Sequence, residues 1–81
     1  MNRQMITRWQ QQLKDETQEL VVKTNKLQDY MRTEQYYLLT RNEKDLLYMQ
    51  LHAMLTYLEA LGKRCEFYGI KLDIKEINKW M

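Results

Sequence analysis

The sequence contains no proline and no serine, two glycines, one cysteine and one histidine. With glycine rare and proline missing, little in the chain interrupts an α-helix. The absence of serine excludes a serine nucleophile. The single Cys65 excludes a disulfide within one chain and fits a reducing compartment, although a bridge between subunits stays open. No apolar run has the length of a signal peptide or a membrane span, so we expect a cytoplasmic protein without membrane association.

The charge is weak and mixed. The 81 residues include 13 basic and 11 acidic side chains, for a net charge of +2. A dedicated binder of duplex DNA usually has a stronger positive bias, and an acidic DNA mimic is excluded. The composition, 44% hydrophobic and 30% charged, is typical of a folded chain and not of a disordered one. The length allows one domain with a small core.

Two apolar stripes at helical spacing dominate the pattern. Residues at i, i+3, i+4 and i+7 share one face of an α-helix. The first stripe comprises Ile6, Leu13, Leu20 and Leu27, and the second comprises Leu47, Leu51, Met54, Leu58 and Leu61. They predict an all-α fold, a long antiparallel helical hairpin with a short C-terminal extension. Because two helices bury little core, we expect the hairpin to assemble as a homo-oligomer.

We expect the hairpin to occupy residues 1–68, with helices over about 2–32 and 42–68 and a linker over 33–41. The linker is apolar and should fold back onto the helices. Thr40 and Glu43 have capping-box spacing, and Gly69 is a plausible stop for the second helix. Gly62 inside that helix is either a tolerated cost or a point of close approach. The tail, 69–81, should contain a short extended piece and then a short helix, and should clasp the hairpin or a neighbouring subunit.

The sequence offers little chemistry. His52 and Cys65 would lie roughly 20 Å apart along one helix, too far to act together. No glycine-rich loop or metal-ligand spacing is present, so we expect no catalytic residues, metal or cofactor. The protein is therefore not expected to be an enzyme.

Several cationic side chains interrupt or flank the stripes. Lys23 falls on the apolar side of the first helix, and a buried lysine needs a partner. Glu16 or Glu19 could supply one and form a polar layer that fixes register. Alternatively, cations surround a small anion while aromatic rings stack on a base. The residues of that second interpretation are Lys23, Lys26, Arg8, Arg64, Trp9, Tyr30 and Tyr57.

Two longer patterns carry a family resemblance. Residues 16–30 read E-x-x-E-L-x-x-K-x-x-K-L-x-x-Y, and residues 46–64 read L-L-x-x-Q-x-x-A-M-x-x-Y-L-x-x-L-x-x-R. In the order and spacing of their charged and aromatic positions, they resemble the helical-hairpin domain shared by phage anti-CBASS and anti-Thoeris sponge proteins. The resemblance extends from about Arg8 to Arg64. The tail beyond Arg64 lies outside it.

This resemblance implies a phage protein that sequesters immune second messengers in an infected bacterial host without cleaving them. The ligand would be a cyclic di- or trinucleotide or a cyclic ADP-ribose isomer, bound between subunits of an assembly from dimer to hexamer. Lys23 and Lys26 match the family's lysine positions, Arg64 its closing arginine, and Tyr30 and Tyr57 its aromatic positions.

Two other interpretations use the same features. A helical module could bind a host protein through its apolar surface, with Trp80, Tyr36 and Tyr37 as anchors. A nucleic-acid-binding accessory protein would use basic residues on both helices, but the weak net charge argues against specific nucleic-acid binding. Its contacts would be Arg3, Arg8, Lys14, Lys63 and Arg64.

Overall fold

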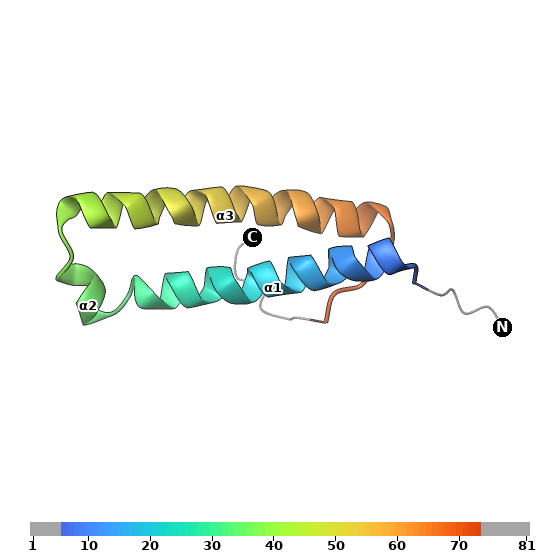
Figure 1. Cartoon of the computed structure of the whole chain (residues 1–81), viewed down its shortest axis with the longest axis horizontal. Helices are drawn as coiled ribbons and strands as arrows, with labels where there is room; N and C mark the ends of the chain where they lie inside the picture. Colours follow the sequence, from blue (N-terminus) through green and yellow to red (C-terminus); the bar gives the residue numbers. More distant parts are fainter. Residues whose placement is uncertain (1–5, 74–81) are drawn as a thin grey trace.

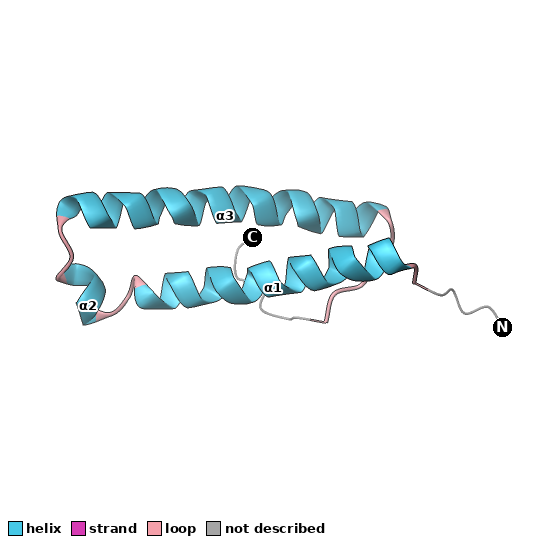
Figure 2. Ribbon diagram, in the orientation of Figure 1, coloured by secondary structure: helices cyan, strands magenta, loops and turns pink. Residues whose placement is uncertain are grey.

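The computed structural model describes residues 6–73 as an antiparallel helical hairpin (Figures 1 and 2). Helix α1 spans Arg8–Tyr30, the short α2 spans Glu34–Tyr37, and α3 spans Arg41–Phe67. The two long helices pack along their lengths, and α2 lies in the connection between them (Figure 1). The hairpin expected from the apolar stripes is confirmed. Neither long helix has the apolar content of a membrane span within the described residues.

Helix α1 begins later than expected because Thr7 caps it. The Gln10 backbone N–H donates to the Thr7 hydroxyl at 3.3 Å, and the Thr7 N–H donates to the Gln10 side chain at 3.1 Å. This reciprocal capping box satisfies two backbone donors that the first turn leaves free. A start near residue 2 was wrong for Ile6 and Thr7, which are not helical, and residues 2–5 lie outside the described range.

The linker contains a short helical turn of its own. Thr33 caps the single turn of α2, where its hydroxyl accepts from the Tyr36 N–H at 3.3 Å. Tyr36 is half-buried against Tyr30, with ring centroids 6.3 Å apart. Leu38, in contrast, is 82% exposed. The expectation that the whole apolar linker folds back onto the helices was therefore wrong at this residue.

Both ends of α3 form as the sequence predicts. Thr40 and Glu43 make the expected capping box. At the other end Gly69 has φ 69°, a left-handed conformation that glycine adopts without steric cost. The Gly69 N–H donates to the Glu66 carbonyl at 3.1 Å and the Ile70 N–H donates to the Cys65 carbonyl at 2.8 Å. These two bonds form a Schellman motif, which turns the chain back along the hairpin.

The core is narrower than the first stripe suggested. Its buried cluster comprises Leu13, Leu20, Val21, Leu58, Leu61 and Cys65. Thr17 and Thr24 are fully buried with them, and each hydroxyl donates to a backbone carbonyl one turn earlier, at 2.7 Å. The second stripe is confirmed at Leu51, Leu58 and Leu61, whereas Ile6, from the first stripe, is 44% exposed.

The buried face of α1 is therefore rotated toward Thr17, Val21 and Thr24. Lys23, which was expected on the apolar side, is exposed, and so is Glu16. The heptad spacing was correct, but the centre of the buried face was not. Threonine can be buried here because its hydroxyl donates a hydrogen bond to a backbone carbonyl of its own helix. The residue type alone does not show that this bond forms.

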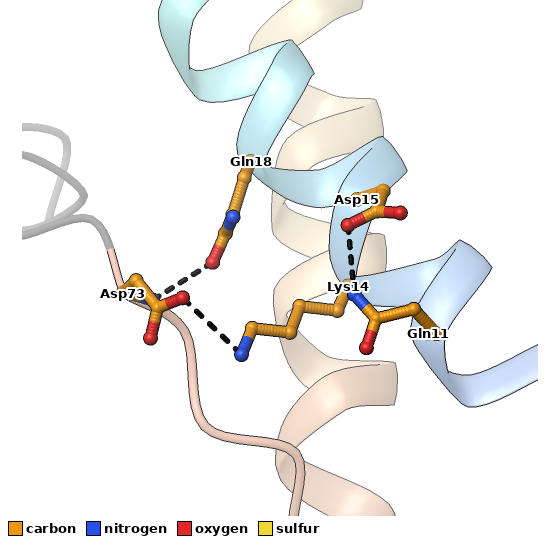
Figure 3. Close-up of polar contacts among 5 residues, drawn as sticks. All are labelled: Gln11, Lys14, Asp15, Gln18 and Asp73. Carbon is orange, nitrogen blue, oxygen red and sulfur yellow. Dashed lines mark hydrogen bonds and ion pairs between the residues drawn. The ribbon is translucent and has the colours of Figure 1, made fainter. Parts of the chain in front are cut away.

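The first residues of the tail dock on the hairpin. Ile70 and Leu72 pack against the core cluster. Figure 3 shows the polar part of the contact: the Asp73 N–H donates to the Gln18 side chain at 2.8 Å, and the Asp73 carboxylate lies 3.3 Å from the Lys14 amino group. The tail thus covers one flank of α1. The short helix expected near the chain end, with Trp80, lies outside the described residues.

Candidate functional site

Six of the matched pattern residues lie along one flank of the hairpin. Residues seven apart occupy nearly the same face of a helix, because seven residues make almost two turns. Glu16, Lys23 and Tyr30 therefore share a flank of α1, and Gln50, Tyr57 and Arg64 share a flank of α3. We call these six residues the motif edge.

A hydrogen bond joins the two helices along the motif edge. The Tyr57 hydroxyl donates to the Glu16 carboxylate. Because the helices are antiparallel, two turns forward on α1 correspond to two turns backward on α3. Lys23 therefore lies level with Gln50, about 10.5 Å beyond the Glu16–Tyr57 contact. In the other direction, Trp9 lies level with Arg64.

Tyr57 reports the electrostatics of this edge. The pKa of its phenol is raised, first by the hydrogen bond to Glu16, then by burial and by the Glu16 charge, while the positive charge of Arg64 opposes the shift. The phenol is therefore a neutral donor at neutral pH.

Two cations of the motif edge and the nearby Lys26 are accessible. Lys23, Lys26 and Arg64 are all exposed. Within residues 6–73, none of the three has a carboxylate within 4.0 Å, and the ion pairs found there join other residues. Glu16 faces Tyr57 and does not neutralise Lys23. The buried polar layer considered for Lys23 is therefore absent from the described part of the chain.

Aromatic side chains flank the Arg64 end of the edge. The Trp9 and Tyr68 rings meet edge to face, with centroids 4.7 Å apart and an interplanar angle of 79°. Both rings keep nearly half of their surface exposed. A ring held on its edge by a neighbour leaves a face on which a flat ligand can stack.

One hairpin does not gather all seven expected ligand contacts. Arg64 lies two turns, about 10.5 Å, from Tyr57 along α3, with Trp9 level with Arg64 and Arg8 next to Trp9 in sequence. Lys23 lies about 10.5 Å from the level of Tyr57 in the opposite direction and about 21 Å from Trp9, whereas Lys26 lies about 27 Å from Arg8 along the same helix. Tyr30 lies at the linker end against Tyr36. A small ligand on one chain can reach only part of the set.

Sequence reasoning missed three participants. Glu16 was weighed only as a partner for lysine, Gln50 was quoted only as a pattern position, and Tyr68 was not considered. The first two could have been found by aligning the two patterns antiparallel, which places Glu16 opposite Tyr57 and Lys23 opposite Gln50. Tyr68 follows the matched pattern, and its contact depends on where α3 ends.

The two residues weighed for catalysis are separated by the fold. Cys65 is buried in the core, where its sulfur lies 3.5 Å from the Thr17 hydroxyl. His52 is exposed and lies against Tyr48, with ring centroids 4.4 Å apart. Within residues 6–73, no three histidine, cysteine or acidic side chains gather as a metal site.

Comparison with known proteins gives one match. The family model described as Sequestin matches residues 7–67, which include both long helices and the whole motif edge. The name fits a cyclic-nucleotide sponge domain, in agreement with the resemblance seen in the two patterns. No curated protein and no solved structure matches the chain.

Proposed function

Because this chain belongs to the Sequestin family, we propose that it binds and sequesters a cyclic nucleotide immune messenger without cleaving it. The family name suggests that its members sequester a small molecule or a protein. It also suggests a binding role rather than catalysis. The cyclic nucleotide, the phage origin and the cytoplasm of an infected bacterium are parts of the proposal. The ligand would be a cyclic di- or trinucleotide or a cyclic ADP-ribose isomer.

The observation that carries the proposal is the combination of charges and rings on the motif edge. Arg64 and Lys23 are exposed cations without carboxylate partners among the described residues, and Tyr57 holds a hydroxyl between them. A guanidinium can form two parallel hydrogen bonds to a phosphate, and an ammonium contributes a compact positive charge. Each charge-assisted contact contributes about 1.5–3 kcal/mol.

Nucleobase recognition would come from the aromatic rings on or beside the motif edge. Stacking on an aromatic side chain contributes roughly 1–3 kcal/mol per base and requires no chemical change in the ligand. Trp9 and Tyr57 each keep nearly half of their surface exposed, and Tyr57 adds a ring between the proposed phosphate-binding cations. Binding of this kind holds the messenger intact, and sequestration requires only sufficient affinity and copy number.

Thermal melting against a panel of messengers tests the proposal. The panel contains cyclic dinucleotides, cyclic trinucleotides and cyclic ADP-ribose isomers. A ligand present at 100 times its dissociation constant stabilises the native state by about 2.7 kcal/mol, a readily visible shift for a small domain. We expect one ligand class to raise the melting temperature and to be recovered unchanged by chromatography. A panel without any shift, or a ligand recovered as a cleaved product, would contradict the proposal.

A second candidate function is binding of a host protein, and one observation favours it. Tyr37, one of the aromatic anchors expected for this interpretation, is 65% exposed beside the exposed Leu38. Exposed aromatic and aliphatic side chains in one patch are typical of protein-binding surfaces. If no messenger shifts the melting temperature, capture of one host protein that is lost with Tyr37→Ala would support this function.

A further inference from the structure

The chain reverses direction after α3 and passes over the first turns of α1 (Figure 1). Tyr68 caps the end of α3, and Gly69 makes the turn with a φ of 69°. Residues 70–73 then run back along the hairpin and form neither helix nor strand. We call residues 68–73 the clasp, because they contact α1 on more than one side.

The two ends of the clasp touch opposite sides of α1. At one end the Tyr68 ring meets the Trp9 ring edge to face, with centroids 4.7 Å apart. At the other end the Asp73 N–H donates to the Gln18 side chain at 2.8 Å (Figure 3). From Trp9 to Gln18 is about two and a half turns of an α-helix, so the two side chains point in opposite directions. The clasp therefore holds the first half of α1 between its ends.

Between these ends, two apolar side chains of the clasp close the core. Ile70 and Leu72 are half-buried and pack against the cluster that contains Leu13 and Cys65. The Ile70 N–H also donates to the Cys65 carbonyl at 2.8 Å. Cys65 is 1% exposed and is the only cysteine of the chain. A thiol reagent therefore has a single target, which lies in the core that the clasp covers.

The ion pair of the clasp is asymmetric. The Lys14 side chain is 20% exposed and the Asp73 side chain is 74% exposed, with 3.3 Å between the amino nitrogen and the carboxylate oxygen. Within residues 6–73, Asp73 supplies the one carboxylate that lies within 4.0 Å of the Lys14 amino group. An ammonium that has lost most of its water needs a partner more than an exposed ammonium does. Lys14 therefore favours the closed position of Asp73.

We propose that the clasp opens and closes as one unit while α1 and α3 stay paired, and that its closure shields Cys65 and holds Trp9 in place. The two long helices pack through residues outside the clasp, such as Leu20, Val21 and Leu58. The clasp itself is held by two half-buried side chains, one ring contact and a few polar contacts. Segments with so few buried contacts open at a lower free energy than the whole domain.

Opening of the clasp on one side of α1 is transmitted to the motif edge on the other side. Trp9 lies level with Arg64 at one end of that edge, and the Tyr68 contact restrains its ring. When the clasp opens, Tyr68 is released and Trp9 loses this edge-to-face contact. The use of Trp9 for base stacking rests on the proposed function, whereas the clasp requires no ligand and is tested without one.

Labelling of Cys65 with N-ethylmaleimide, read by mass spectrometry, measures how often the clasp opens in the full native chain. A local opening exposes little surface, so its free energy depends weakly on denaturant, whereas unfolding of the hairpin depends on it steeply. We therefore expect a labelling rate that is nearly constant at low urea concentrations. A rate that rises steeply from the lowest urea concentrations would overturn the proposal, because only unfolding of the whole hairpin would then expose the thiol.

Two variants weaken the clasp at its buried contact and at its charged contact. Leu72→Ala should raise the labelling rate at low urea about tenfold, because it removes most of a half-buried side chain. Asp73→Asn should raise it about two- to fivefold, since an ion pair with one exposed partner contributes modestly. The matched controls are Leu39→Ala, at a half-buried leucine of the linker, and Asp45→Asn, which loses the Arg41 ion pair. Both should leave the rate unchanged, and equal rates in the variants and their controls would overturn the proposal.

A variant on the other side of α1 tests whether the clasp opens as one unit. Tyr68→Ala removes the ring contact with Trp9 and should raise the Cys65 labelling rate about two- to tenfold, as the loss of one aromatic pair predicts. Tyr48→Ala, which loses a ring contact within α3, is the matched control and should leave the rate unchanged. An unchanged rate in Tyr68→Ala, beside a raised rate in Leu72→Ala, would show that the two sides open separately and would contradict the single unit that we propose.

Discussion

Tyr57 donates a hydrogen bond from α3 to the carboxylate of Glu16 on α1, and this contact fixes how the two halves of the motif edge align. It places Lys23 level with Gln50 and Arg64 level with Trp9. Residues 41 positions apart in sequence thereby become neighbours on one flank. On the opposite flank of α1, the first residues of the tail contact Lys14 and Gln18.

Removal of the Arg64 guanidinium should weaken messenger binding more than it weakens the fold. Arg64 is exposed and lies near the end of α3, so Arg64→Ala should change the melting temperature of the free protein little. Loss of a charge-assisted phosphate contact of about 1.5–3 kcal/mol corresponds to a fall in affinity of roughly ten- to a hundredfold. Isothermal titration calorimetry measures it. Arg32→Ala, at the linker end, is the control and should bind normally.

The lysines of α1 should separate according to their place on the edge. Lys23→Ala should lower messenger affinity by a factor of about ten, because Lys23 lies on the motif edge, two helical turns from the level of Tyr57. Lys26→Ala should also lower affinity but by less, since its side chain lies further round the helix. Both variants should keep their helical content by circular dichroism. Loss of folding in both, with no binding by the native chain, would instead indicate a structural role.

The raised pKa of Tyr57 gives a prediction about alkaline stability. The Glu16 carboxylate opposes ionisation of the phenol, so the native-state pKa lies above the ordinary value of 10.0. A group with a raised native pKa stabilises the fold fully below its unfolded pKa, and this contribution is lost as the pH rises through the native pKa. Native stability should therefore fall above about pH 10 more steeply than that of Tyr57→Phe.

Ultraviolet titration of the phenols isolates the same effect. The absorbance difference between the native chain and Tyr57→Phe gives the titration curve of this one tyrosine. In Glu16→Gln the curve should move to lower pH, because the carboxylate charge is gone while the fold remains. An unchanged curve in Glu16→Gln would mean that Glu16 does not control the phenol.

The two glycines should respond in opposite directions to alanine. Gly62 lies inside α3 with open space where a Cβ would extend, so Gly62→Ala should stabilise the protein by about 1 kcal/mol through helix propensity. Gly69 has a positive φ that an alanine tolerates poorly, so Gly69→Ala should destabilise by about 1–2 kcal/mol. Chemical denaturation measures both. Equal effects of the same sign would contradict the assigned roles.

Periodicity predicted the hairpin because each helix buries one face, and the capping residues predicted where α3 begins. It did not predict where α1 begins, since the Thr7–Gln10 capping box competes with an earlier start. It also misplaced Lys23, because burial of Thr17 and Thr24 rotates the core away from the lysine. Spacing identifies which residues share a face, but not which of two adjacent faces is buried.

The candidate site was only partly accessible from sequence. Tyr57 and Arg64 were identified from the pattern, and both lie on one flank of α3, two helical turns apart. Lys26 and Tyr30 matched the same pattern, yet they lie toward the opposite end of the edge, which periodicity cannot show without the register of the helix pair.

Calorimetric titration of cyclic nucleotide messengers into the native chain, with the ligand recovered afterwards, tests the central claim most directly. We expect saturable binding of one messenger class, recovery of that messenger intact, and at least a tenfold loss of affinity in Arg64→Ala with the fold preserved. Absence of binding by every messenger, or binding that Arg64→Ala and Lys23→Ala leave unchanged, would contradict the assignment of the motif edge as a messenger site.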